Sequence, residues 1–435
     1  MTVRRRTALS LSLVAVLAAS GSALAAEAGP EIGAPAPLAA GVVVRPMVLA
    51  TGSTTPAEDL GARVEAALRT SGATTIAAAV DVDGLGEVYR HEAAHALPPA
   101  STQKTFTGLA ALLAVPPGTR FTTEVAARTT PTAGRLPGSL WLVAGGDPYL
   151  TKTGLRGLAH QVRGTGITYV TGDLLLDDSR YDARRRVPGW KSAYVPDESG
   201  PLSALAVDRN GYRDDSGFLS DPALPNTTLF RSYLAAEGVT VHGVVRRYHR
   251  PVDARTVAVV TSGPIADVVR RALKRSDNFA AELLLKEVGK AVRNDGSSAG
   301  GYAAMSDVLG TRGVPVGTGT DGSGLSSYDR QTPGGQLMLL KAAEQDPAVG
   351  TAFRRALPIA CQDGTLEKRM CGTAAAGRLS AKTGTLPGAR ALSGYTTTAS
   401  GRKVWFSFQL TAFSNGTTAR NAIDRAAVVL ASAQE

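Results

Sequence analysis

Cysteine, histidine and aromatic residues are scarce in this sequence. Its 435 residues include two cysteines and five histidines, and aromatic residues make up 5% of the chain. Two cysteines cannot form a structural zinc site, and the histidines are scattered without the spacing of metal ligands. The residue content therefore does not indicate a metal-centred function.

The sequence also lacks a long block of positive charge. Its formal net charge is +10, but the basic residues are dispersed, and beyond the N-terminus the densest run is Arg184-Arg185-Arg186. No basic segment is interleaved with aromatic residues, so nucleic-acid binding is not expected. Hydrophobic residues make up 43% of the chain, which is enough to bury cores and excludes wholesale disorder.

Long apolar stretches are absent except near the N-terminus. Residues 4–6 are arginines, residues 8–19 are mostly apolar, and Ala23-Leu24-Ala25 has the small-residue pattern of a cleavage site. These features predict a signal peptide over residues 1–26 and hence a secreted, extracytoplasmic protein. An uncleaved anchor helix is the alternative interpretation.

The two cysteines, Cys361 and Cys371, are close in the sequence. In an exported protein such a pair favours a disulfide, which we predict here. The closed loop would be short, so its contribution to stability would be about 3 kcal/mol or less.

The remaining chain divides into segments that differ in residue composition and in the spacing of turn residues. Residues 27–57 are rich in Ala, Pro, Gly and Thr and are interpreted as a flexible leader. Residues 124–255 alternate short strand-like runs with Gly, Pro and Asp turns, which favours a separate inserted domain. We predict helices over 59–69, 102–115, 228–236, 265–274, 280–291 and 418–433, and strands over 74–82, 85–90, 139–144, 167–176, 239–245 and 256–261, with three more strands within 377–414.

The first motif that can carry chemistry is Ser101-Thr102-Gln103-Lys104, at the start of the predicted helix over 102–115. Residues i and i+3 share a helix face, so Lys104 can reach the Ser101 hydroxyl. A serine hydroxyl needs a nearby base to act as a nucleophile, and a desolvated lysine with a lowered pKa can be that base. A second Ser-x-x-Lys, residues 400–403, lies in a predicted hairpin turn with no helix after it.

The second motif, Ser276-Asp277-Asn278, lies between two predicted helices. A hydroxyl and an amide held on a tight turn can pass a proton and hold a peptide bond. Because Ser, Asp and Asn all favour helix N-caps, a simple cap is the alternative interpretation.

The third motif is Lys382-Thr383-Gly384-Thr385, in a strand-like run. A lysine flanked by hydroxyls can bind a substrate carboxylate, and Gly384 would let a substrate backbone approach the strand closely. The alternative is an exposed edge strand whose lysine blocks aggregation. A second Lys-Thr-Gly, residues 152–154, precedes Ser276 and lacks the strand context.

Together the three motifs are more specific than any one alone. Ser-x-x-Lys, Ser-x-Asn and Lys-Thr-Gly occur in the order that is typical of penicillin-binding proteins and class A β-lactamases. The chain further resembles the D-alanyl-D-alanine carboxypeptidases and endopeptidases of the penicillin-binding protein 4 type, serine peptidase family S13. This resemblance covers about residues 58–430 and rests on segments 142–148, 172–179, 321–326, 364–366 and 392–395.

The resemblance implies an α/β (α+β) fold. A β-lactamase/transpeptidase-like serine peptidase domain would comprise residues 58–123 and 256–435, with a smaller domain, residues 124–255, inserted between the first and second motifs.

The resemblance also implies roles for the motif residues. Ser101 would attack the substrate with Lys104 as its base, and Ser276 with Lys382 would protonate the leaving D-alanine. Asn278 would hold the amide on the acyl side. The substrate-binding residues would be Thr383, Gly384 and Thr385, with the two threonines on the terminal carboxylate.

The implied substrates are peptidoglycan stem peptides, and the implied location is the cell wall. β-Lactams would acylate Ser101 as covalent inhibitors, and no metal or organic cofactor would be needed. The alternatives are a β-lactamase or esterase on the same fold and a catalytically silent wall-binding protein. A class A β-lactamase needs a deacylating glutamate that is not found after Ser276, and silent proteins usually lose part of the motif trio.

Overall fold

The structure is a computed structural model that describes residues 55–211, 213–214, 217–218 and 220–434. The predicted signal peptide and nearly all of the predicted leader therefore lie outside the described residues. The first described helix, α1 (Pro56–Arg69), begins within the last two residues of the predicted leader, where the Thr55 side chain caps it by accepting from the Glu58 amide. Among the described residues no helix is both long and apolar enough to span a bilayer.

A five-stranded antiparallel sheet joins the two ends of the described chain. Its strand order is β13-β14-β15-β1-β2. The strands are β1 (Thr75–Val82), β2 (Gly86–His91), β13 (Ser380–Leu386), β14 (Ala389–Thr397) and β15 (Lys403–Thr411). The predicted strand pair over 74–82 and 85–90 and the three strands within 377–414 are confirmed. The motif strand β13 is an edge of this sheet.

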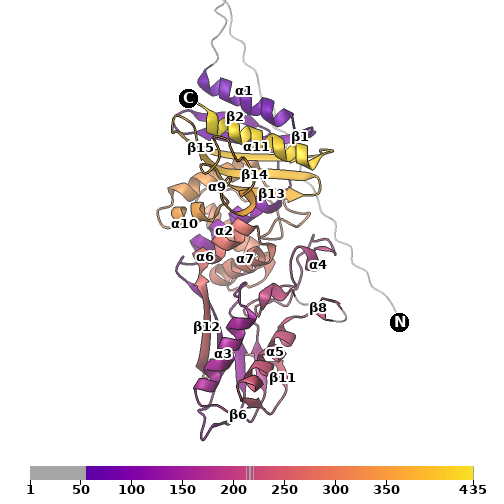
Figure 1. The fold of residues 1–435 in the computed structure, drawn as a ribbon, viewed down its shortest axis with the longest axis vertical. Coiled ribbons are helices and arrows are strands. Elements are labelled where there is room, and N and C mark those ends of the chain that lie inside the picture. The colour runs from indigo at the N-terminus through magenta and orange to yellow at the C-terminus, as the bar shows by residue number, and fades with distance from the viewer. Residues whose placement is uncertain (1–54, 212, 215–216, 219, 435) are drawn as a thin grey trace, which may run out of the picture. The chain divides into compact units, whose positions relative to one another are not determined.

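The two faces of this sheet carry different helices, because side chains alternate along each strand. Val80 and Phe406 pack in the core with α1 and α11 (Gly416–Ser432), which lie side by side over one face (Figure 1). Ala79 points the other way and packs with Leu337 of α9 (Pro333–Gln345).

A group of helices forms the layer that contains the first two motifs. Its core joins α2 (Gln103–Ala114), α6 (Ile265–Arg275), α7 (Asn278–Arg293), α8 (Ser298–Gly310), α9 and α10 (Gly350–Ala356). Helix α2 is buried from Gln103 to Leu112, on all of its faces. A helix buried all round belongs to the interior, so the end that bears Ser101 and Lys104 is anchored in the core of the molecule.

A second five-stranded sheet, of order β11-β7-β5-β3-β12, is built from the middle of the chain. Its strands are β3 (Arg120–Ala127), β5 (Leu140–Val143), β7 (Leu174–Asp177), β11 (Val245–Arg247) and β12 (Arg255–Pro264). Helices α3 (Lys152–Gly164) and α5 (Ala223–Ala236) pack in the core of this sheet. Between β7 and α5 the chain also forms the short helix α4 (Tyr194–Asp197) and the short strand pair β8 (Arg213–Asp214) and β9 (Gly217–Phe218). The first predicted domain boundary, at residue 124, falls inside β3, and the second, at residue 255, falls at the start of β12. The division into two domains stays a prediction.

Two predicted strands are each divided in the structure. The run over 167–176 forms β6 (Tyr169–Val170) and β7, and the run over 239–245 forms β10 (Thr240–Val241) and β11. The division arises from the tertiary structure: β6 lies between β10 and β4 (Arg135–Leu136) in a small sheet, whereas β7 and β11 pair with each other in the larger sheet. Gly172 lies at the crossing, where a Cβ would be 2.7 Å from the Gly138 carbonyl oxygen.

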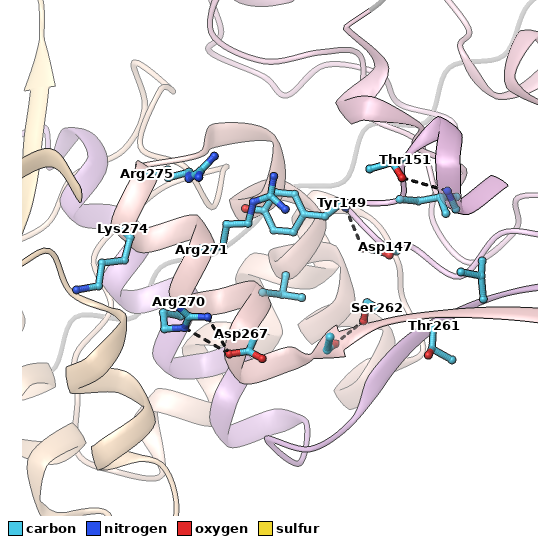
Figure 2. Close-up of a pocket in the computed structure, with 15 residues that line it drawn as sticks. Asp147, Tyr149, Thr151, Thr261, Ser262, Asp267, Arg270, Arg271, Lys274 and Arg275 are labelled. Carbon is cyan, nitrogen blue, oxygen red and sulfur yellow. Dashed lines mark hydrogen bonds and ion pairs between the residues drawn. The ribbon is translucent and has the colours of Figure 1, made fainter. Parts of the chain in front are cut away.

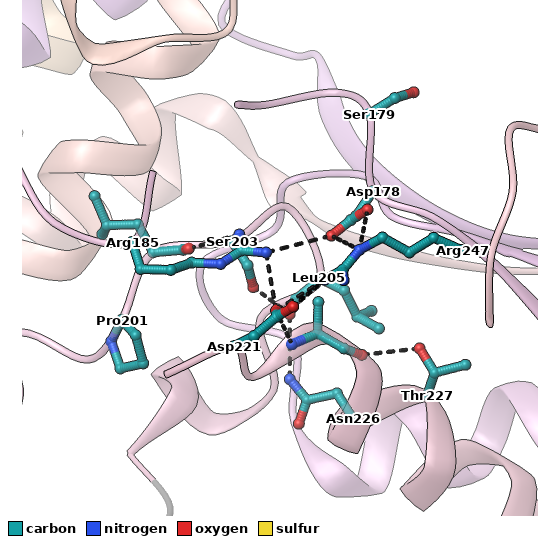
Figure 3. Close-up of polar contacts among 12 residues, drawn as sticks. Asp178, Ser179, Arg185, Pro201, Ser203, Leu205, Asp221, Asn226, Thr227 and Arg247 are labelled. Atoms are coloured by element: carbon teal, nitrogen blue, oxygen red, sulfur yellow. Dashed lines mark hydrogen bonds and ion pairs between the residues drawn. The ribbon is translucent and has the colours of Figure 1, made fainter. Parts of the chain in front are cut away.

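Part of the dispersed charge forms a compact ionic cluster near β11 (Figure 3). Arg247 pairs with Asp178 at 3.1 Å and with Asp221 at 2.7 Å, and Arg185 pairs with Asp221 at 2.9 Å. The cluster ties the chain after β7 to the segment before α5. Arg185, which belongs to the densest basic run, therefore forms an ion pair inside the protein.

Candidate active site

The three motifs meet around one cavity of about 720 Å³. Ser101, Ser276, Asn278, Thr383 and Thr385 all line it. Lys104 and Lys382 lie behind this lining, with no exposed surface. The fold thus brings together residues that are almost 300 positions apart in the chain.

Ser101 and Lys104 stand where the chain enters helix α2. Ser101 is half-buried in the short helix η1 (Ala100–Thr102), and Lys104 lies in the first turn of α2. The Lys104 Nζ is 2.9 Å from the Ser101 Oγ, as the i, i+3 spacing predicts. The same Nζ is 2.7 Å from the Asn278 Oδ1 and 2.6 Å from the Ser323 carbonyl oxygen. One buried amine therefore links the first two motifs.

Burial gives Lys104 the character of a base. Desolvation lowers its pKa to about 8, although the carboxylates of Asp321 and Glu282 act in the opposite direction. The ammonium form loses its hydration inside the protein, so the neutral amine is favoured. A lysine with a pKa near 8 is partly neutral near pH 7 and can take a proton from a neighbouring hydroxyl.

The second motif combines a helix cap with two cavity residues. Asp277 is the N-cap of α7, with its side chain accepting from the Ala280 amide. Ser276, the residue before this cap, has a left-handed backbone with φ 55°. Asn278 begins α7 and donates from Nδ2 to the Glu198 carbonyl oxygen at 3.0 Å. The cap interpretation thus holds for the middle residue, while both of its neighbours line the cavity.

The third motif lies on the edge strand β13, with its side chains on alternate faces. Lys382 is fully buried, and its Nζ donates to the Ser276 Oγ at 2.9 Å. Desolvation and the nearby Lys104 hold the pKa of Lys382 well below its usual value. An exposed lysine that blocks aggregation is therefore the wrong interpretation for Lys382, even though its strand is an edge. Thr383 and Thr385 face the cavity, and the Thr383 hydroxyl lies 2.8 Å from that of Thr365.

Two glycines allow other segments to close around Ser101. A Cβ on Gly384 would lie 2.8 Å from the Pro99 carbonyl oxygen, so glycine lets β13 pack against η1. A Cβ on Gly324 would lie 1.9 Å from the Ala100 carbonyl oxygen. The sequence interpretation assigned Gly384 to close approach of a substrate. In the structure the glycine is needed for close approach of the chain itself.

The two stray motif copies lie elsewhere. Residues 152–154 form the first turn of α3, and residues 400–403 lie in the turn that leads into β15. Neither segment lines the cavity. The stray copies therefore lie apart from the cavity that residues of the three motifs line.

Three buried carboxylates behind Lys104 were not singled out from the sequence. Asp321, Glu282 and Asp329 have no exposed surface. Burial raises the pKa of Glu282 to about 8 and that of Asp329 to about 10. The Ser323 amide donates to Glu282 at 2.8 Å and to Asp321 at 3.2 Å. Of these three residues, only Asp321 belongs to a segment that the sequence analysis used, the string over 321–326.

Several other cavity residues also escaped the sequence analysis. Tyr194 and Glu198 come from α4 and the residue that follows it, and Arg369, Arg390 and Arg420 come from three separate segments. None belongs to a recognisable motif, because their proximity to Ser101 arises only from the fold.

The two cysteines form the disulfide Cys361–Cys371. The bridged loop contains Thr365 and Arg369, which line the cavity. The bond therefore constrains one wall of the site from outside.

A separate hollow of about 750 Å³ lies along α6 (Figure 2). The Arg271 guanidinium lies over the Tyr149 ring, 3.8 Å from its centroid, and Arg270 pairs with Asp267. None of the motif residues lines this hollow. It is therefore distinct from the candidate active site.

Comparison with known proteins identifies the family. The family model for the D-Ala-D-Ala carboxypeptidase 3 (S13) family matches residues 56–215 and 217–434. A D-alanyl-D-alanine carboxypeptidase of an Actinomadura species is 30% identical over 406 residues, covering 74% of this chain and 75% of the relative. The carboxypeptidase DacB of Mycolicibacterium smegmatis is 32% identical, covering 81% of this chain and 79% of the relative.

A solved structure agrees with the fold. Penicillin-binding protein 4 of Haemophilus influenzae superimposes with a TM-score of 0.77 at 23% identity, covering 83% of this chain and 97% of that chain. The predicted α/β, β-lactamase/transpeptidase-like fold is confirmed, and so is the predicted enzyme class, a serine-type carboxypeptidase. The chain belongs to the D-Ala-D-Ala carboxypeptidase 3 (S13) family, as its three motifs predicted.

Proposed function

We propose that this protein is a secreted D-alanyl-D-alanine carboxypeptidase that trims peptidoglycan stem peptides through an acyl-enzyme on Ser101. The observation that carries the proposal is the position of Lys104. Its fully buried Nζ lies 2.9 Å from the Ser101 Oγ, and its pKa is lowered to about 8. This pairing supplies a nucleophile and its base in one cavity.

The proposed acylation begins with proton transfer from the Ser101 Oγ to the Lys104 Nζ. The Oγ then bonds to the carbonyl carbon between the two D-alanines. Backbone N–H groups of Ser101 and Thr385 stabilise the oxyanion, a role that favours preorganised donors. The close packing of β13 against η1 at Gly384 supports this pairing of donors.

Release of D-alanine requires a proton on the leaving nitrogen. Ser276 is placed for this transfer, because its Oγ lies in the cavity and is bonded to the Lys382 Nζ at 2.9 Å. The C–N bond breaks as the nitrogen is protonated. Water then cleaves the ester on Ser101, releasing the shortened peptide and restoring the hydroxyl.

The remaining motif residues orient the substrate. Asn278 holds the amide on the acyl side of the substrate. When the substrate binds, the hydrogen bond from Asn278 to Glu198 is replaced by one to the substrate. Thr383 and Thr385 hold the terminal carboxylate from β13. The same groups would receive a β-lactam, and a β-lactam complex is known for Haemophilus influenzae penicillin-binding protein 4. The predicted signal peptide supports a site of action at the cell wall.

The test is covalent labelling by a fluorescent penicillin, with the Ser101→Ala variant as its control. We expect a stable label on the mature wild type, no label on the variant, and release of D-alanine from a D-Ala-D-Ala peptide by the wild type alone. Rapid turnover of a cephalosporin without D-alanine release would instead favour a β-lactamase. Absence of both label and D-alanine release would favour a silent wall-binding protein.

A further inference from the structure

The loop behind Lys104 is held by a segment from the middle of the chain. This loop comprises residues 321–326, and its Ser323 carbonyl oxygen accepts from the Lys104 Nζ at 2.6 Å. The segment is Pro188-Gly189-Trp190, which lies between β7 and α4, within the stretch predicted as the inserted domain. The environment of the proposed base therefore includes residues outside all three motifs.

Backbone atoms of this segment bind to the loop and to the residues that flank it. The Thr320 Oγ1 and the Ser326 Oγ each donate to the Pro188 carbonyl oxygen at 2.9 Å. The Ser327 amide donates to the Gly189 carbonyl oxygen at 3.2 Å. Gly189 has a φ of 84°, and a Cβ there would lie 2.2 Å from the Ser326 Oγ. Glycine is therefore needed for this close approach.

A side-chain contact joins Trp190 to the buried carboxylate of Asp321. The indole Nε1 donates to Oδ2 at 2.7 Å. Asp321 has no exposed surface, and a buried carboxylate without donors is costly. Within the loop, the Gly324 and Ser326 amides also donate to Asp321, at 2.7 and 2.8 Å. The indole and the two amides together hold this carboxylate in one orientation.

Asp321 connects this contact to Lys104 through both geometry and charge. Its Oδ1 accepts from the Ser323 amide at 3.2 Å, and the carbonyl group of the same serine accepts from the Lys104 Nζ. Burial lowers the pKa of Lys104 to about 8, and the negative charge of Asp321 is the largest opposing influence. A displacement of Asp321 therefore changes both the position and the electrostatic surroundings of the Lys104 amine.

The Trp190 ring is suited to hold Asp321 because it is anchored on its other side. The ring is partly buried and packs against the core of the second sheet. An indole offers one N–H donor and no acceptor, and its ring is rigid. The contact therefore fixes the distance between that core and the loop behind the proposed base.

We propose that Trp190 is a positioning residue that holds Lys104 beside Ser101 by acting through Asp321 and Ser323. The middle stretch of the chain thereby supports acylation. The inference deepens the proposed function and rests on it, because Lys104 acts as the base only if Ser101 is the nucleophile. Trp190 itself does not line the cavity that contains Ser101, so its effect is indirect.

The first experiment uses Trp190→Phe, which removes the indole N–H and keeps an aromatic ring. Penicillin labelling is resolved into the dissociation constant of the initial complex and the rate constant of the covalent step. We expect the rate constant to fall about tenfold, as for loss of a hydrogen bond to a charged group. The dissociation constant should change less than about twofold, because the lost support acts on the reacting groups and not on binding. An unchanged rate constant, or a loss confined to binding, would overturn the positioning role.

A double-mutant cycle tests whether the effect passes through Asp321. In an Asp321→Asn background the indole faces an uncharged group, so adding Trp190→Phe should lower the rate constant by less than about threefold. Fully additive losses would contradict this route. Trp141→Phe is the matched control, because the buried Trp141 Nε1 has no hydrogen-bond partner in the part of the chain that the structure describes. An equal loss in this control would also contradict the proposal.

A spectroscopic measurement separates this inference from the proposed function. In protein with ¹³C-labelled lysine, the ε-carbon resonance of Lys104, assigned with Lys104→Met, reports the base whether or not Ser101 reacts. Trp190→Phe and Asp321→Asn should both shift this resonance, and Trp141→Phe should not. If the wild type neither takes the label nor releases D-alanine, the proposed function fails, but this resonance still decides the inference. An unchanged resonance in Trp190→Phe refutes it.

Discussion

The Lys104 Nζ lies 2.6 Å from the Ser323 carbonyl oxygen, although the two residues are 219 positions apart in the chain. The Ser323 amide is in turn bonded to buried Glu282 and Asp321. Lys104, the proposed base, is thus positioned by a loop that has no part in the three motifs. This loop connects catalysis to the acidic cluster behind the site.

Acylation should depend on pH through Lys104. Burial lowers the pKa of this amine to about 8, and only its neutral form can accept the Ser101 proton. The second-order rate constant for labelling by penicillin should therefore rise about tenfold per pH unit below pH 8 and level off above it. Stopped-flow labelling between pH 5.5 and 9.5 measures this profile. A flat profile across that range would contradict the role of Lys104.

Replacing the base should nearly abolish acylation without unfolding the protein. Lys104→Met preserves the length of the side chain but cannot take up a proton. Loss of general-base catalysis should reduce the labelling rate by roughly 100- to 10,000-fold. Thermal unfolding followed by circular dichroism checks that the variant remains folded. A folded variant that is labelled within tenfold of the wild-type rate would exclude Lys104 as the base.

The acidic cluster should make stability depend on pH in a defined direction. Burial raises the pKa of Glu282 to about 8, so the folded state holds a proton that the unfolded state releases near pH 4.5. Between these values the unfolded state binds fewer protons, and the free energy of unfolding falls as pH rises. Glu282→Gln keeps the Oε1 acceptor and removes this titration. Relative to the variant, the wild type should lose stability from pH 5 to pH 8 in urea unfolding; parallel curves would contradict this.

Gly384→Ala should disturb the site by displacing β13 from η1. The added Cβ would lie 2.8 Å from the Pro99 carbonyl oxygen, so one of the two segments must shift. Overpacking of this kind costs about 1–3 kcal/mol of stability. We also expect slower penicillin labelling, because the shift moves Thr385 relative to Ser101. Denaturant unfolding and labelling rates measure both effects.

Gly157→Ala is the control for this variant. Gly157 lies within α3, where an added Cβ would meet no atom within 4 Å. Replacing a helical glycine with alanine should raise stability by about 0.5–1 kcal/mol and leave labelling unchanged. If both variants behave alike, packing at Pro99 is not the cause.

Removal of the disulfide should weaken one wall of the cavity. The Cys361–Cys371 bond closes a loop between residues 10 positions apart, and loop entropy predicts a loss of about 3 kcal/mol in a variant with both cysteines changed to alanine. Because Thr365 and Arg369 lie in that loop, KM should rise more than kcat falls. Reducing agent should lower the melting temperature of the wild type and not that of the variant. A variant that melts at the same temperature as the oxidised wild type would refute a stabilising role.

Local sequence information was enough to identify the motifs and part of the regular elements, whereas α3, α8, α9 and β3 were not predicted. The i, i+3 spacing of Ser101 and Lys104 depends only on helix geometry, so their contact followed once a helix was expected there. The strand pair β1 and β2 likewise followed from an alternating pattern around one tight turn. Division of the run over 167–176 into β6 and β7 did not follow, because the two halves pair with different sheets.

What the sequence by itself determined is the reaction family: the order of the three motifs and the string over 321–326 identify it without coordinates. Only the tertiary structure decided the chemical state of the site. Burial of Lys104 and Lys382 sets their pKa values, and burial is a property of all the chain packed around them. Arg390 and Arg420 come from different elements and line one cavity only because β14 and α11 pack together.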